Sequence, residues 1–171
     1  ANMSAGQLAR LSSEDSTSAL RWDRGTAAIE LAGGNTVFNA DLWREDRRQL
    51  DLEVTLSDAA QQRLHGTLAL DAFSVTGTLK PFFPMFSDHS GVLNGKLDFS
   101  GSLLKPNVLG LLTLSGGNFS LVGNPTSFEQ LELALKAKGD HIDLDGGLIV
   151  GGGKTHISGS LLLPGARRDQ P

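Results

Sequence analysis

The stretch from Leu93 to Leu121 constrains the fold most, because its apolar and polar side chains alternate. Leu97 and Phe99 share one parity, whereas Lys96 and Asp98 share the other. A β-strand projects successive side chains to opposite faces. The stretch therefore predicts strands with one apolar face and one solvated face.

Two breaks interrupt this alternation. The pattern restarts after Lys105-Pro106-Asn107 and again after Gly116-Gly117. Residues of these types favour tight turns. The sequence thus predicts a meander of three strands within the stretch.

Alternation also extends over most of the remaining chain. The segment 128–137 contains good helix formers, but its leucines alternate, and periodicity is the stronger signal. A parity shift at Asp71-Ala72 predicts a bend or bulge. The expected turns are Asp23-Arg24-Gly25, Gly33-Gly34-Asn35, Glu45–Arg48, 57–62 and Gly139-Asp140. Further strands are expected at residues 19–22, 28–31, 36–44, 50–56, 64–70, 73–79, 128–137, 142–144 and 155–163. The predicted class is all-β.

The segment near residues 81–87 breaks the β pattern. Pro81 and Pro84 exclude a central strand here, and we expect one short helical turn. Phe82, Phe83 and Phe86 then plug one end of the sheet, or they form an exposed aromatic knob that contacts a partner or lipid.

One short motif recurs, in which a glycine lies between two apolar residues of the same strand face. Glycine in a strand permits sharp bending or the close approach of another backbone. The repeated glycines therefore predict a sheet that curls into an apolar trough, or they make room for the side chains of an opposing sheet in a sandwich. The motif surrounds Gly66, Gly77, Gly95, Gly101, Gly110 and Gly159.

Composition excludes several classes of protein. The chain has 171 residues, enough for one domain, and its 15 basic and 19 acidic residues give a net charge of −4. This balance argues against nucleic-acid binding. No cysteine is present, and no apolar run is long enough to span a bilayer as a helix. We expect one β domain over residues 1–171, as a fragment of a longer protein, with a weakly ordered start at 1–18 and a polar tail at 164–171.

No catalytic or metal site is predicted. His141, Asp143 and Asp145 share a strand face, but Ile142 and Leu144 between them face the core, so the polar row is best interpreted as the solvated face. The Gly-rich segment 148–155 lacks the phosphate-loop spacing and is interpreted as a turn or bulge. No nucleophile elbow occurs. We therefore expect no enzyme activity and no cofactor.

The succession of strands resembles a known family. The run from Gly95 to Phe119 reads Gly-x-Leu-x-Phe-x-Gly, then Lys-Pro-Asn-Val-x-Gly-x-Leu-x-Leu, then Gly-Gly and a large apolar residue. It is similar to the C-terminal (DUF490-type) region of the TamB family, within the AsmA-like group. The resemblance covers residues 90–163 well and 36–80 loosely.

The resemblance implies a U-shaped, taco-like β-groove with an apolar interior. It implies a periplasmic location in a protein anchored in the bacterial inner membrane, and a partner, TamA, which is a BamA-like outer-membrane barrel. Its implied roles are outer-membrane protein (autotransporter) assembly and phospholipid transport, with acyl chains or unfolded outer-membrane protein strands as cargo. It offers no catalytic motif.

The candidate site is the lining of this groove, assigned by parity. The competing interpretation is a closed β-sandwich or solenoid that serves as a spacer and carries no cargo. The predicted lining residues are Leu52, Val54, Leu68, Leu70, Leu93, Leu97, Phe99, Leu103, Val108, Leu112, Leu114, Phe119, Leu121, Leu131, Leu133, Leu135, Ile142, Leu144, Ile157, Leu161 and Leu163.

Overall fold

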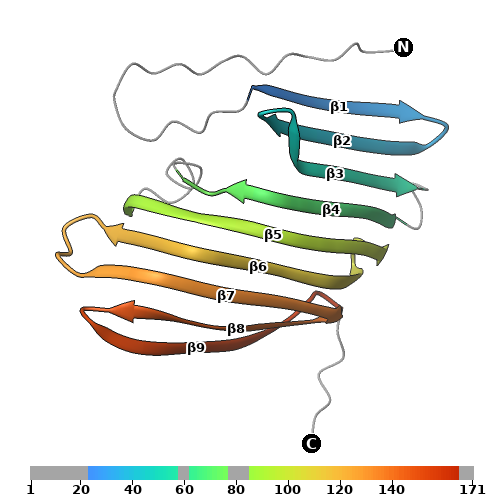
Figure 1. Ribbon diagram of the computed structural model, residues 1–171. Helices are drawn as coiled ribbons and strands as arrows, with labels where there is room; N and C mark the ends of the chain where they lie inside the picture. Colours follow the sequence, from blue (N-terminus) through green and yellow to red (C-terminus); the bar gives the residue numbers. More distant parts are fainter. Residues whose placement is uncertain (1–22, 58–61, 77–84, 166–171) are drawn as a thin grey trace, which may run out of the picture.

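The computed structural model describes residues 23–57, 62–76 and 85–165. These residues form one antiparallel sheet of nine strands in chain order (Figure 1). The strands are β1 (Arg24–Ala32), β2 (Asn35–Arg44), β3 (Arg47–Ser57), β4 (Arg63–Ser74), β5 (Phe86–Ser102), β6 (Lys105–Leu121), β7 (Ser127–Gly139), β8 (His141–Val150) and β9 (Gly153–Leu162). The all-β prediction is confirmed, and the described residues contain no helix.

The sheet does not close on itself. β1 and β9 lie at its opposite edges, and each pairs with one neighbour only. The described strands therefore form a single layer, without a second sheet facing it.

The predicted three-stranded meander is wrong. Only β5 and β6 occupy this stretch, and the chain reverses at Leu103 and Leu104. Gly116 and Gly117 lie inside β6, where Gly116 has a φ of 59°. The glycine pair forms a β-bulge, which bends a strand without reversing it.

Other boundaries were also misplaced. Asp23-Arg24-Gly25 is not a turn, because β1 begins at Arg24. β8 continues through Gly146 and Gly147 as far as Val150, and Gly151 and Gly152 make the turn. β8 is thus longer than the strand predicted at 142–144, because glycine inside a central strand need not end it.

Two further predictions are confirmed. Residues 128–137 form most of β7 rather than a helix. The parity shift at Asp71-Ala72 is a bulge, at which the register between β4 and β5 changes and Ala72 has a φ of 50°. Periodicity was thus the better guide than residue propensity.

Several predictions fall outside the described residues. They include the weakly ordered start at 1–18, the strand at 19–22, the side chains of Phe82 and Phe83, and residues 166–171 of the tail. The helical turn expected near 81–87 is wrong where it can be compared, because Met85 lies in a turn and β5 begins at Phe86.

Glycines bring neighbouring backbones close together and so let the sheet curl. A Cβ atom on Gly66, Gly95 or Gly110 would overlap a carbonyl oxygen of the adjacent strand. Gly101 is similarly crowded by the carbonyl oxygen of Lys105, whereas Gly159 has no atom within 4 Å of its hypothetical Cβ. Gly77 lies outside the described residues. The close-approach role of the motif therefore holds at particular positions rather than at every repeat.

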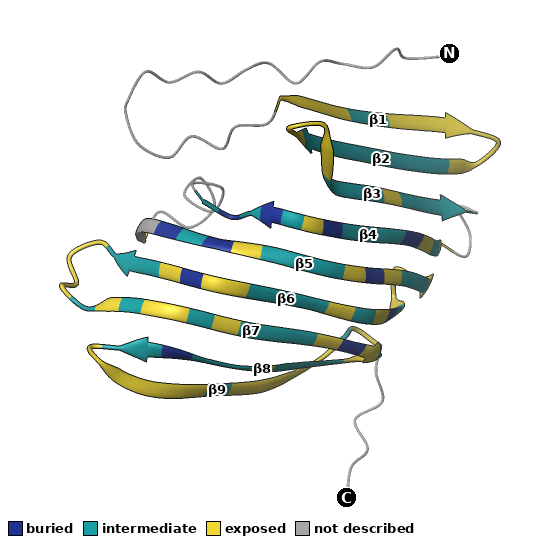
Figure 2. Ribbon diagram, viewed as in Figure 1, coloured by how far each residue is buried: buried dark blue, intermediate teal, exposed yellow. Residues whose placement is uncertain are grey.

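The apolar side chains gather on the concave face. Leu70, Phe73 and Val75 form one buried cluster, against which Leu42 of β2 also packs. The backbones of β2 and β4 would be nearly 10 Å apart on a flat sheet, so an inward curl favours this packing. A second cluster contains Leu97, Val108 and Ala137, which are 8%, 6% and 4% exposed. Figure 2 shows the buried positions on β4 to β8 and the exposed edge strands β1 and β9.

Candidate functional site

The candidate site is the concave apolar face, which we call the groove. Strand pairing aligns its side chains in rows that cross the sheet. One row runs Leu42, Leu50, Leu70, Gly95, Leu112, Leu135, Leu144 and Gly159. The next runs Ala40, Leu52, Leu68, Leu97, Gly110, Ala137, Ile142 and Leu161. Neither row contains a polar side chain, so the groove floor offers only apolar contacts.

Nearly all predicted lining residues lie on this face. The exceptions by position are Leu163, which follows β9, and Leu103, which lies in the β5–β6 turn. Leu163 still packs against the cluster that contains Leu97, Val108 and Ala137. Leu103 is 47% exposed and does not join the face, because β5 ends at Ser102 before the alternation reaches it. Leu161 is on the face but 60% exposed, since β9 is an edge strand.

The groove also contains residues that sequence reasoning left out. Phe38, Leu42 and Leu50 align with the lining by register. Phe73, Val75, Ala137 and Leu148 are among its most buried members. Alternation from Ile142 through Gly146 would have included Leu148, but the predicted strand covered only residues 142–144.

The opposite face, which we call the polar face, carries exposed ion pairs, and Leu109 and Leu111 are exposed among them. Lys138 Nζ lies 2.8 Å from Asp143 Oδ2, and Lys96 Nζ lies 2.9 Å from Asp98 Oδ1. Hydrogen bonding from Lys138, together with its positive charge, lowers the pKa of Asp143. His141 likewise lowers the pKa of Asp140, because its Nδ1–H donates a hydrogen bond to Asp140 Oδ1 at 2.9 Å.

The polar row of β8 is held by these local pairs. His141 contacts Asp140, Asp143 contacts Lys138, and His156 Nε2 lies 3.5 Å from Asp145 Oδ2. Among residues 23–57, 62–76 and 85–165, no three His, Cys, Asp or Glu side chains are arranged to hold a metal ion. Nor does this part of the chain form a helix that could cross a membrane.

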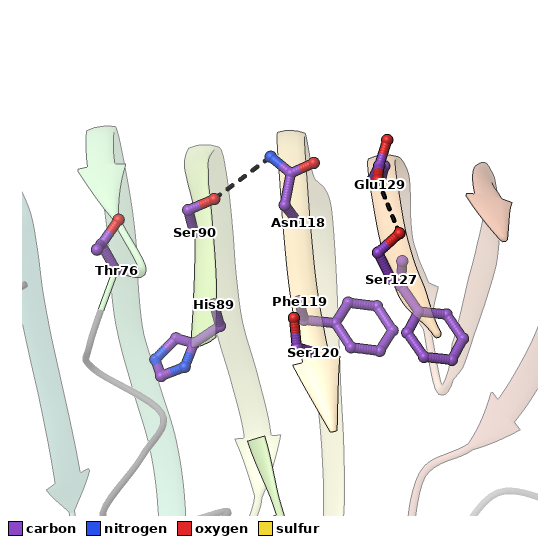
Figure 3. A pocket seen from close by; sticks show the side chains of 9 residues that line it. Thr76, His89, Ser90, Asn118, Phe119, Ser120, Ser127 and Glu129 are labelled. Carbon is purple, nitrogen blue, oxygen red and sulfur yellow. Dashed lines mark hydrogen bonds between the residues drawn. The ribbon is translucent and has the colours of Figure 1, made fainter. Parts of the chain in front are cut away.

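One side of the groove ends in an aromatic pair. The rings of Phe119 on β6 and Phe128 on β7 stack with centroids 4.4 Å apart and planes 4° apart. They line a shallow depression of about 440 Å³ (Figure 3). The other residues that line this depression are Thr76, His89, Ser90, Asn118, Ser120, Ser127 and Glu129. A mixed polar and aromatic border thus adjoins the purely apolar floor.

A family model supplies the decisive comparison. The model for the TamB N-terminal domain matches residues 2–114, which is more than half of the chain. The chain belongs to the TamB family. No curated protein and no solved structure shows significant similarity to it.

The match corrects the predicted position within the TamB family. The resemblance pointed to the C-terminal region, whereas the matching model is that of the N-terminal domain. A degenerate strand pattern specifies the type of sheet but not which part of a long protein carries it. TamB family membership associates the chain with the translocation and assembly module and with biogenesis of the bacterial envelope.

Proposed function

We propose that this chain is a segment of an envelope-biogenesis protein whose groove shields apolar cargo as it crosses the periplasm. The cargo that the groove fits best is a phospholipid acyl chain. In this proposal the protein is anchored in the inner membrane and works with TamA, and the groove binds and shields rather than catalyses. The observation that carries the proposal is the uninterrupted apolar floor of an open sheet.

The energetic argument starts from the floor rows. Each methylene removed from water contributes about 0.8 kcal/mol, so a dozen methylenes contribute roughly 10 kcal/mol before entropic costs. Leu70, Leu112 and Leu135 lie in one floor row without a polar neighbour in that row. A surface without fixed polar partners lets an acyl chain slide along it.

A polypeptide suits the floor less well than an acyl chain. Its backbone N–H and C=O groups need hydrogen-bond partners, and burying them without partners is costly. The sheet edges favour a second cargo, since β1 and β9 each have one side without a strand partner among the described residues. An unfolded outer-membrane protein strand could extend the sheet there by β-augmentation.

The test uses two neighbouring leucines on opposite faces. Leu112 lies on the groove floor, and Leu111 lies on the polar face with 46% of its surface exposed. A photocrosslinking amino acid is introduced at either position, and lipid adducts formed in vivo are identified by mass spectrometry. We expect phospholipid adducts at 112 and few at 111.

Matched charge substitutions complete the test. Leu112→Asp should abolish lipid transport, whereas Leu111→Asp should leave it intact, because only the first places a charge among the acyl chains. Circular dichroism verifies that both variants fold. Equal labelling at the two positions, or none at either, contradicts the cargo groove and favours the structural spacer.

A further inference from the structure

Three central strands contain an extra residue close to the aromatic end of the groove. The register shifts at Ala72 in β4, at Gly116 in β6 and at Gln130 in β7. These residues have φ values of 50°, 59° and 51°. Each is therefore a bulge residue in the left-handed region, which costs free energy for a side chain other than glycine.

A side chain of the neighbouring strand accepts a hydrogen bond from each bulge residue. The Ala72 N–H donates to Asn94 Oδ1 at 2.7 Å. The Gly116 N–H donates to Glu132 Oε1 at 2.7 Å, and the Gln130 N–H donates to Asn118 Oδ1 at 3.2 Å. A bulge residue loses its place in the strand ladder, so its N–H needs such a partner. We call Asn94, Asn118 and Glu132 the bulge pins.

The bulges decide on which face of the sheet the apolar residues at the aromatic end of the groove lie. Leu70 and Phe73 are three positions apart, as are Phe128 and Leu131, and Leu114 and Phe119 are five apart. An odd spacing in a regular strand places two side chains on opposite faces. One extra residue restores the parity, so each member of a pair reaches the groove.

These redirected residues form one side of the groove, which we call the lip: Phe73, Val75, Phe119 and Phe128. Phe73 and Val75 are 8% and 6% exposed, and the rings of Phe119 and Phe128 stack. Without the bulges, both aromatic rings of the stack would face the polar side. The lip therefore depends on side chains of the opposite strand parity, of which Asn118 also lines the depression beside the aromatic pair.

We propose that Asn94, Asn118 and Glu132 are positioning residues that hold the lip aimed into the groove. They act by fixing the bulges that turn the lip aromatics toward the cargo. This inference rests on the proposed function, because it gives the lip a role in contacting acyl chains.

The experiment maps where an acyl chain touches the protein. Palmitic acid that carries a diazirine is photolysed with the full chain, and adduct sites are identified by mass spectrometry. The unmodified chain should be labelled at Leu112 on the floor and at Phe119 and Phe128 on the lip. In Asn118→Ala, lip labelling should fall by about tenfold, because the bulge N–H loses its acceptor, while floor labelling persists.

Two controls separate positioning from general destabilisation. Asn124 Oδ1 also accepts a backbone N–H, that of Thr126 at 2.9 Å, but in the β6–β7 turn. Asn124→Ala should therefore leave lip labelling unchanged. Glu132→Gln keeps an acceptor oxygen and should retain lip labelling, whereas Glu132→Ala should lose it.

The outcomes distinguish the two proposals. Unchanged lip labelling in Asn118→Ala and Glu132→Ala, with the floor still labelled, overturns the role of the pins alone. Equal loss of lip labelling in Glu132→Gln and Glu132→Ala also overturns the role of the pins. Absence of floor labelling in the unmodified chain overturns the acyl-chain groove itself. If Asn118→Ala does not fold, the two Glu132 variants decide.

Discussion

Gly110 offers the sharpest test of how this sheet curls. It lies between Val108 and Leu112 in β6 and has a φ of 136°, a backbone conformation that residues with side chains rarely adopt. A Cβ atom here would overlap the carbonyl oxygen of Lys96 and lie 3.1 Å from the Cα of Leu97. Gly110→Ala must therefore change its own backbone or displace β5.

Both costs can be estimated. An L-residue held in this glycine region costs about 1–3 kcal/mol. Displacing a packed neighbour costs about 1–3 kcal/mol more. We expect Gly110→Ala to lower the free energy of unfolding by about 4 kcal/mol, a large part of the 5–15 kcal/mol typical of a domain.

Gly159 provides the matched control. It occupies the same motif, between Ile157 and Leu161, but has no neighbouring atom within 4 Å of a Cβ. Gly159→Ala should change stability by less than about 1 kcal/mol, and in the stabilising direction through lower unfolded-state entropy.

Urea denaturation followed by far-UV circular dichroism compares the two variants. The midpoint should fall for Gly110→Ala with an unchanged slope, because the fold is kept but destabilised. If the two variants agree within about 0.5 kcal/mol, the close approach of β5 and β6 at Gly110 does not constrain the sheet, and this explanation of the curl is refuted.

Three further predictions concern local contacts. A double-mutant cycle on Phe119→Leu and Phe128→Leu should give a coupling of about 1 kcal/mol from ring stacking, and a coupling near zero in urea denaturation would show that the rings do not interact. The guanidinium groups of Arg24 and Arg48 lie 4.6 Å and 5.9 Å from the ring centroid of Trp43. Trp43→Leu should therefore lower the free energy of unfolding by about 1 kcal/mol, and an unchanged urea midpoint would contradict these contacts. The pKa of Asp143 lies below its ordinary value of 3.8. The ion pair with Lys138 therefore stabilises the fold at pH values above 3.8, and this stabilisation is lost as the pH falls through the lowered pKa of Asp143 in the folded state. Lys138→Met should return the Asp143 pKa toward 3.8 in a carboxyl NMR titration, and no change would exclude Lys138 as the cause.

The all-β class and much of the groove followed from sequence alone. Side-chain direction in a strand depends only on parity, so Leu97, Leu112 and Leu135 could be assigned to one face before any pairing was known. The same reasoning identified the bulge at Ala72, because a change of parity within an apolar pattern requires an extra residue.

Only the tertiary structure decided what the glycines do. Gly116-Gly117 resembles a turn in sequence but bulges within β6, because Glu132 of the neighbouring strand accepts the Gly116 N–H. Gly110 is crowded and Gly159 is not, although their motifs match, since crowding depends on the backbone of the paired strand. The face of each side chain is a local property of its own strand. The curl and the lip depend on contacts between strands, which no single segment encodes.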